Sequence, residues 1–304
     1  MGGGTGGARQ AGGKRPPADT IRLVLRSLDL LLLLLLAAIW GASFLFIKVA
    51  VKEMSPVFLA SMRLAIGAAG LSLIYRLVTR RSSGPAKPPG AAGAPLWARA
   101  LVLGLAGGVV PYVLIAWGEI HINSGAASIL NATSPLFSAL FGHFLGLWGE
   151  EERLSWTRGL GLGLGIAGVA ALSVSQRDDS ASAEAALQVL GCLAVVGGSA
   201  SYAVGALYAR LAFAGSGALL PATAQNVGGV AVLLPFGLLF ARPDTRVSLE
   251  AAGAVLALGG FGTVLAYVLY YRVMTRLGAT GVLSVTYLLP GFALVYGAAF
   301  LGEA

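Results

Sequence analysis

The chain has 304 residues, of which 57% are hydrophobic and only 11% are charged, and its mean hydropathy is +0.81. Soluble domains average roughly 45–50% apolar and about 25% charged residues, so this composition excludes a soluble enzyme or nucleic-acid-binding protein. The formal charge of +8 does not point to nucleic acid, because the basic residues form short clusters between apolar runs. We therefore expect an all-α integral membrane protein whose partner is the lipid bilayer and not a nucleic acid.

The first 27 residues are rich in glycine and basic residues and show no hydrophobic periodicity. They predict a disordered cytoplasmic tail at 1–27, and not a secretory signal, because the apolar run from Leu28 is long enough to span a bilayer. Beyond it, apolar runs of about 20 residues separated by turn residues predict nine membrane-spanning helices. We expect these helices near residues 28–51, 56–78, 97–119, 123–148, 155–175, 186–210, 218–241, 249–274 and 279–302.

The distribution of the 21 Lys and Arg residues predicts how the chain is oriented. With the N-terminus in the cytoplasm, 15 of them fall in inner segments, four in outer segments, and two, Lys48 and Arg63, inside helices. Positive residues concentrate on the cytoplasmic side of membrane proteins. We therefore predict a multi-pass protein of the cell (inner or plasma) membrane with a cytoplasmic N-terminus.

Two shifts of the sequence along itself predict an internal repeat. A shift of 162 residues gives the pairs Trp40/Tyr202 and Arg63/Gln225. A shift of 155 residues gives further pairs, among them Tyr112/Tyr267, Pro135/Pro290 and Phe137/Phe292. Chance matching in helices rich in Gly and Ala is the alternative, but matches of Tyr, Pro and Phe are harder to obtain by chance.

Each repeat is expected to hold five helices, and because five is an odd number the second repeat must insert inverted. The predicted domains are the tail at 1–27, a first repeat of five helices at 28–175 and a second repeat with four visible helices at 186–304. The counterpart of the helix at 155–175 would begin beyond Glu303. We therefore interpret the sequence as a C-terminally truncated ten-helix protein, with a genuine nine-helix variant as the alternative.

The run WGASFLFIK from Trp40 to Lys48, followed by SPVFLASMR ending at Arg63, resembles the opening of EamA-like families in the drug/metabolite transporter (DMT) superfamily. The fourth-helix pattern Ser134-Pro135-Leu136-Phe137 and its recurrence as Leu289-Pro290-Gly291-Phe292 are similar to the same families. The resemblance implies two inverted five-helix repeats around a central cavity. It also implies a secondary transporter that moves small metabolites (amino acids, related organic solutes or drugs) by alternating access, often as an exporter, and a homodimer formed through helices five and ten.

The sequence contains no ATP-binding motif, and no His pair is spaced to bind a metal. We therefore expect no cofactor, no catalytic residue and no metal site, with a small-molecule substrate as the partner. A proton gradient, a solute gradient or facilitated exchange would drive transport. The alternatives are an intramembrane lipid-modifying enzyme, which would need a reactive cluster that the sequence does not display, and a non-transporting membrane scaffold.

Arg63 is the clearest charged candidate, because it lies seven residues into the second helix, about 10 Å deep. A charge at membrane depth is expensive and usually functional. Arg63 can bind a carboxylate or phosphate of a substrate; the alternative is a structural Arg that bonds to helix-end carbonyls or extends to the interface. Lys48, in the last turn of the first helix, is interpreted as extending to the interface.

Aromatic and uncharged polar side chains complete the predicted site, since in the fold that the resemblance implies their helices line the cavity. Flat rings with polar tips suit amphipathic or aromatic solutes, although rings near helix ends also form interfacial belts. Amides and hydroxyls can bind a ligand or join helix to helix. The predicted substrate-binding residues are Trp40, Arg63, Tyr112, Asn131, Ser134, Tyr202, Gln225, Tyr267 and Tyr287.

Two pairs of residues are candidates for motion and for proton coupling. Pro135 and Pro290 are interpreted as mid-helix hinges, because proline frees a backbone carbonyl; a packing kink is the alternative. Glu119 and His121 end the third helix, where a carboxylate beside an imidazole can relay protons. The alternative is that they only mark the outer water interface.

Overall fold

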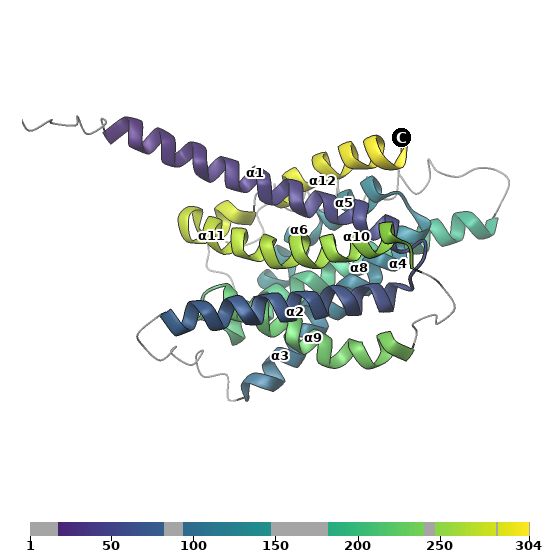
Figure 1. Cartoon of the computed structure of the whole chain (residues 1–304), viewed down its shortest axis with the longest axis horizontal. Coiled ribbons are helices and arrows are strands. Elements are labelled where there is room, and N and C mark those ends of the chain that lie inside the picture. Colours follow the sequence, from purple (N-terminus) through teal and green to yellow (C-terminus); the bar gives the residue numbers. More distant parts are fainter. Residues whose placement is uncertain (1–17, 82–93, 147–181, 240–246, 284, 304) are drawn as a thin grey trace, which may run out of the picture.

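The computed structural model describes residues 18–81, 94–146, 182–239, 247–283 and 285–303, and every regular element in these ranges is helical. The helices lie side by side as a bundle (Figure 1). Six described helices are long and apolar enough to cross a membrane, and the apolar stretch Val285–Leu301 is shorter. The predicted all-α membrane fold is thereby confirmed. The helix expected at 155–175 lies outside the described residues.

The first two helices are α1 (Ala18–Ala50) and α2 (Pro56–Arg81). α1 starts ten residues before Leu28, so residues 18–27 are helical, which differs from the prediction of a disordered tail there. The part of α1 that is apolar enough to cross a membrane nevertheless begins at Leu28. Hydropathy marks the entry into lipid, whereas backbone hydrogen bonds continue the helix without needing apolar side chains.

Two long spans contain a π-helical segment at equivalent positions. The first comprises α3 (Leu96–Gly104), η1 (Leu105–Val109) and α4 (Val110–His121), and the second α10 (Leu249–Gly259), η3 (Gly260–Leu265) and α11 (Ala266–Leu283). Leu105 and Gly260 are separated by the 155 residues of the sequence repeat. π segments inside α-helices are rare and are frequent at functional sites. The internal repeat is therefore present in the backbone as well as in the sequence.

Close contacts of small residues follow the same repeat. A Cβ on Gly262 would approach Ser43 Oγ to 2.8 Å, and a Cβ on Gly205 would approach Gly107 Cα to 2.7 Å. Gly262 is the repeat counterpart of Gly107 under the shift of 155 residues, and Gly205 is the counterpart of Ser43 under the shift of 162 residues. Each π segment thus packs closely on the first helix of the opposite repeat. Residues next to a π segment therefore lie where the two repeats meet.

The helix expected at 123–148 is divided into α5 (Ser124–Asn131) and α6 (Ser134–Phe144). Pro135 consequently lies in the first turn of α6 and not in mid-helix, which differs from the prediction. The carbonyl of Asn131, which the proline nitrogen cannot engage, accepts a hydrogen bond from Ser134 Oγ at 2.8 Å. Pro290, by contrast, lies inside α12 (Val285–Tyr296) as predicted.

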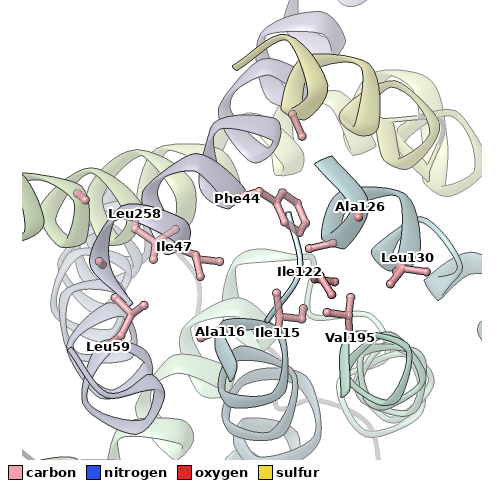
Figure 2. Packing of buried hydrophobic residues seen from close by; sticks show 14 of the residues in the cluster. Phe44, Ile47, Leu59, Ile115, Ala116, Ile122, Ala126, Leu130, Val195 and Leu258 are labelled. Carbon is pink, nitrogen blue, oxygen red and sulfur yellow. The ribbon is translucent and has the colours of Figure 1, made fainter. Parts of the chain in front are cut away.

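The remaining described elements are α8 (Ser182–Ala212), α9 (Leu219–Leu239) and η4 (Gly297–Leu301), which continues α12. α11 runs through the expected break at 275–278 and ends at Leu283, because its backbone stays helical beyond the apolar run. The largest apolar core joins α1, α2, α4, α5, α8, α10 and α12 (Figure 2). In that view Phe44, Ile47, Leu59, Ile115, Val195 and Leu258 converge from five of these helices.

One end of the bundle, here named the Lys48 end, is where α1, α4 and η4 stop and where α5 and α10 begin. Lys48 Nζ donates hydrogen bonds to the carbonyl oxygens of Glu119 (2.6 Å) and Ile122 (2.8 Å) at the end of α4. Glu303 Oε2 accepts hydrogen bonds from Ser124 N (2.9 Å) and Ser124 Oγ (2.6 Å) at the start of α5. Charged side chains of one element therefore form hydrogen bonds with the free backbone groups at the end of another helix, with the sign of charge that the helix dipole favours.

Glu53 plays the same role for α10. The Glu53 carboxylate accepts hydrogen bonds from Ser248 N (2.8 Å) and Ser248 Oγ (2.7 Å), and Ser248 Oγ also accepts one from Ala251 N. The backbone and side-chain hydrogen bonds from Ser248 hold the pKa of Glu53 below its usual value. Because the folded-state pKa is lowered, the stabilisation is present above the unfolded-state pKa and is lost as the pH falls through the folded-state pKa.

Replacing Glu53 with Gln is therefore expected to lower the melting temperature slightly at neutral pH and to make no difference in strong acid. The measurement is the melting temperature of both proteins in detergent between about pH 7 and about pH 3. Glu250→Gln, which changes an exposed carboxylate in the first turn of α10, is the matched control. If the melting temperatures of Glu53→Gln and the unmodified protein differed by the same amount at every pH, Glu53 would not stabilise the start of α10 as a carboxylate.

Candidate functional site

The buried guanidinium of Arg63 is the centre of the candidate site. Arg63 lies on α2 and is 8% exposed. Its Nε donates a hydrogen bond of 3.2 Å to Thr263 Oγ1 in η3, and its Cζ lies 3.9 Å from the centre of the Tyr112 ring on α4. A guanidinium above an aromatic face gains a cation–π attraction that is stronger away from water. Arg63 is therefore held by both repeats.

Aromatic rings lie near Arg63 in both repeats, and Tyr202 and Tyr267 interact electrostatically with Arg63 and Tyr112. Tyr112 meets Tyr202 of α8 edge-on at 6.1 Å between ring centres. The ring of Tyr270 lies 6.4 Å from that of Tyr267 and 5.8 Å from that of Trp40 on α1. Gln225 of α9 donates from Nε2 to the Tyr267 hydroxyl at 3.1 Å. The Arg63 cluster, as we name it, comprises Trp40, Arg63, Tyr112, Tyr202, Gln225, Thr263, Tyr267 and Tyr270.

Within the Arg63 cluster the two repeats make equivalent contacts with different chemistry. Arg63 contacts Tyr112 in one half, and Gln225, its repeat counterpart, contacts Tyr267, the counterpart of Tyr112, in the other. Gln225 Oε1 also approaches η1, since a Cβ on Gly107 would lie 2.8 Å from it. The architecture is thus nearly twofold, but the positive charge belongs to one half alone.

Six of the nine predicted substrate-binding residues belong to the Arg63 cluster, and three do not. Asn131 and Ser134 lie at the α5–α6 break, where Asn131 Oδ1 accepts a hydrogen bond from Ser199 Oγ at 3.4 Å. Tyr287 is 64% exposed on α12 and makes none of the described contacts with the Arg63 cluster. The described contacts of Asn131 and Ser134 thus join helix segments, whereas Tyr287 lies on the surface of the bundle.

Three neighbours of the predicted site were not anticipated. Tyr270 follows Tyr267 by three residues on the same helical face, so the helical period was a usable signal. Thr263 gave no such signal, because its approach to Arg63 depends on the π segment of the other repeat. Asn226 is fully buried; its Nδ2 donates to Ala222 O at 2.9 Å, whereas its Oδ1 has no hydrogen-bond partner among the described residues and faces Gly67.

Glu119 and His121 are separated by their environments although they are close in sequence. The Glu119 side chain is 0% exposed, and neither of its carboxyl oxygens has a hydrogen-bond partner in the described part of the chain. His121 is partly exposed and its ring packs 4.7 Å from the Trp117 ring. Residues two apart on a helix do not face each other, so the direct relay suggested by the sequence has no geometric basis here.

Two helical repeats that present their third helices and π segments to each other beside the buried Arg63 are the arrangement expected of repeat-built membrane transporters. The sequence model of the EamA-like transporter family matches residues 28–174 and 189–304. The chain therefore belongs to the EamA-like transporter family and is a multi-pass membrane transporter.

Known transporters are similar to this chain over most of their length. An uncharacterised transporter of Archaeoglobus fulgidus is 31% identical over 90% of this chain and 89% of its own. A probable terminal-alkyne amino-acid exporter of Streptantibioticus cattleyicolor is 27% identical over 89% and 84%, respectively. The uncharacterised inner membrane transporter YedA of Escherichia coli is 25% identical over 87% and 80%. A solved crystal structure with 20% identity superposes with a TM-score of 0.59 over 91% of this chain and 90% of that one, which supports the fold.

Proposed function

We propose that this protein is a secondary transporter that exports small carboxylate-bearing metabolites, such as amino acids and related organic solutes, by alternating access between its two repeats. The buried Arg63 is the observation that carries the proposal. Among the described residues no carboxylate lies within ion-pair distance of Arg63, and its hydrogen bond goes to an uncharged hydroxyl. A buried cation without an acidic partner is unfavourable unless a ligand supplies the negative charge.

The chemistry of the guanidinium suits a carboxylate. Its planar fork donates two parallel hydrogen bonds to a carboxylate, and this arrangement is stronger than hydrogen bonds between neutral groups. In Arg63 the Nε is used by Thr263, while the Tyr112 face fixes the plane of the group. We infer that the terminal nitrogens bind the carboxylate of the solute.

The rest of the Arg63 cluster suits the remainder of such a solute. Tyr202, Tyr267, Tyr270 and Trp40 offer apolar ring faces together with hydroxyl or indole N–H groups. Gln225 and Tyr267 add an uncharged hydrogen-bonding pair in the second repeat. We infer that the carboxylate binds to the first repeat and that the side chain of the solute contacts the rings of the second.

Export and orientation are part of the proposal. The relative from Streptantibioticus cattleyicolor, whose name describes an amino-acid exporter, supports export, and YedA, named as an inner membrane transporter, supports the inner or plasma membrane. The positive-inside rule supports a cytoplasmic N-terminus, which would make the Lys48 end the outer end. The transporter names of these relatives favour transport over the alternative of a lipid-modifying enzyme.

The test is exchange in proteoliposomes that contain the purified full chain. Vesicles are loaded in turn with unlabelled amino acids, 2-oxo acids, amines and sugars, and entry of the same radiolabelled solute is followed by counterflow. We expect exchange with at least one carboxylate-bearing solute and none with the amines or sugars. Exchange of neutral or cationic solutes alone would contradict the carboxylate assignment, and exchange of no solute with properly oriented protein would contradict the transport proposal.

A further inference from the structure

A second buried ionisable side chain, outside the Arg63 cluster, lies at the Lys48 end. Glu119 is fully buried two residues before the end of α4, and its carboxyl oxygens have no hydrogen-bond partner among the described residues. Ile115, Ala116 and Ile122 of the same helix end pack with Val195 in the apolar core shown in Figure 2. A charged carboxylate without partners in such surroundings is strongly unfavourable, so the neutral, protonated form fits this arrangement.

The charged groups around Glu119 are already engaged with other partners. Lys48 from α1, Arg63 from α2 and Glu303 beyond η4 act on it electrostatically, Lys48 most strongly. The Lys48 ammonium, however, donates to the backbone carbonyls of Glu119 and Ile122, and Glu303 accepts from Ser124. His121 on the same helix packs on Trp117, and Cys192 of α8 lies in the apolar core that contains Ile115 and Ala116 of α4. Lys48 is thus a cation close to the carboxyl but held by the α4 end.

We propose that Glu119 is a proton-binding site that controls closure of the Lys48 end. With the proton bound, Lys48 stays on the two carbonyls and ties α1 to the end of α4 and the start of α5. When the carboxyl releases its proton to water, the buried carboxylate attracts Lys48, whose Nζ leaves the carbonyls of Glu119 and Ile122. Proton release thereby moves Lys48 from the backbone to the Glu119 side chain, frees the Ile122 carbonyl and with it the connection into α5, and opens this end.

This mechanism rests on the proposed transport function and adds its driving force. A proton bound when the Lys48 end is closed and released when it is open links the movement of the solute to a pH gradient. If one proton moves per solute molecule, a gradient of one pH unit can sustain an accumulation of about tenfold.

The first experiment uses the proteoliposomes of the exchange assay. A pH gradient is imposed with the membrane potential clamped, and accumulation of an exchanged solute is measured. We expect accumulation by the unmodified protein, its loss in Glu119→Gln, and its retention in Glu250→Gln, an exposed carboxylate on α10 at the same end. Exchange at equal pH without any response to the gradient would overturn the proton site and leave the proposed function standing.

A second measurement needs no substrate. Cys192, the single cysteine of the chain, is buried on α8 against the end of α4, since a Cβ on the adjacent Gly191 would lie 3.1 Å from Gly118 O. The rate of maleimide labelling of Cys192, divided by that of the denatured chain at the same pH, reports opening. We expect this ratio to rise several-fold with pH in the unmodified protein, to stay low in Glu119→Gln, and to be high at every pH in Lys48→Met. The same pH course in unmodified protein and Glu119→Gln would overturn the proposal, whether or not a transported solute is known.

Discussion

Replacing Arg63 with Ala is expected to weaken transport of carboxylate-bearing solutes by roughly ten- to 150-fold in kcat/KM, because a hydrogen bond to a charged group contributes about 1.5–3 kcal/mol. Arg63 is the charge of the cluster that holds Tyr112 and Thr263 from opposite repeats. Arg63→Lys keeps the charge but loses the planar fork and should recover only part of the activity. The measurement is initial counterflow at a series of solute concentrations.

Two controls separate binding from folding in this experiment. Arg76→Ala removes an exposed Arg from the same helix and should leave transport and melting temperature close to those of the unmodified protein. A neutral analogue of the best solute, such as its amide, should be transported equally by the unmodified protein and by Arg63→Ala. Normal transport of the carboxylate by folded Arg63→Ala would remove the assigned role of Arg63 and leave the rest of the proposal untouched.

Replacing Gly228 with Ala is expected to lower the free energy of unfolding by about 1–3 kcal/mol, the usual effect of overpacking, and the melting temperature by several degrees. A Cβ on Gly228 would overlap the carbonyl of Ala100, and one on Gly104 would overlap the backbone of Gly229. α3 and α9 therefore touch through backbone atoms, which cannot rotate aside as a side chain can. Close approach through small residues is a common way for helices to associate in a membrane.

The matched control has the opposite expected sign. Gly253 lies on α10, and apart from the adjacent backbone of its own helix no described atom lies within 4 Å of the position that an added methyl group would take. Gly253→Ala therefore only restricts the unfolded backbone and should stabilise the protein by about 0.4–1 kcal/mol. Both variants are measured as melting temperatures in the same detergent. Equal shifts in the two variants would show that helix propensity, and not the α3–α9 contact, controls the effect at Gly228.

Several members of the Arg63 cluster could be predicted because the membrane makes unusual residues informative. Arg63 is a charge at lipid depth, and the sequence repeat pairs it with Gln225 and pairs Tyr112 with Tyr267. Tyr287 was predicted by the same aromatic criterion, but it is largely exposed. The identity of a side chain does not reveal which face of an apolar helix is buried when all its faces are apolar.

Interactions between distant segments explain the remaining differences. Lys48 was interpreted as extending to the interface, but its ammonium caps α4, because the unsatisfied carbonyls at that helix end lie beside α1. The break between α5 and α6 is stabilised by Ser134 and by Ser199 of α8, which donates to Asn131. Proline in the sequence indicates that a backbone hydrogen bond is lost. It does not indicate whether nearby hydroxyl groups can satisfy the freed backbone and side-chain groups, so that the helix divides into two.

Hydropathy and the spacing of rare residues are properties of the chain alone, and they are sufficient to establish a helical membrane protein with an internal repeat. The same two properties make Arg63 and its aromatic neighbours candidates for the site. Which groups meet is a matter of tertiary packing: Arg63 contacts Thr263 of the other repeat, and Lys48 contacts the end of α4, beside the buried carboxyl of Glu119. These contacts join residues between 71 and 200 positions apart, so they depend on how the helices pack around one another.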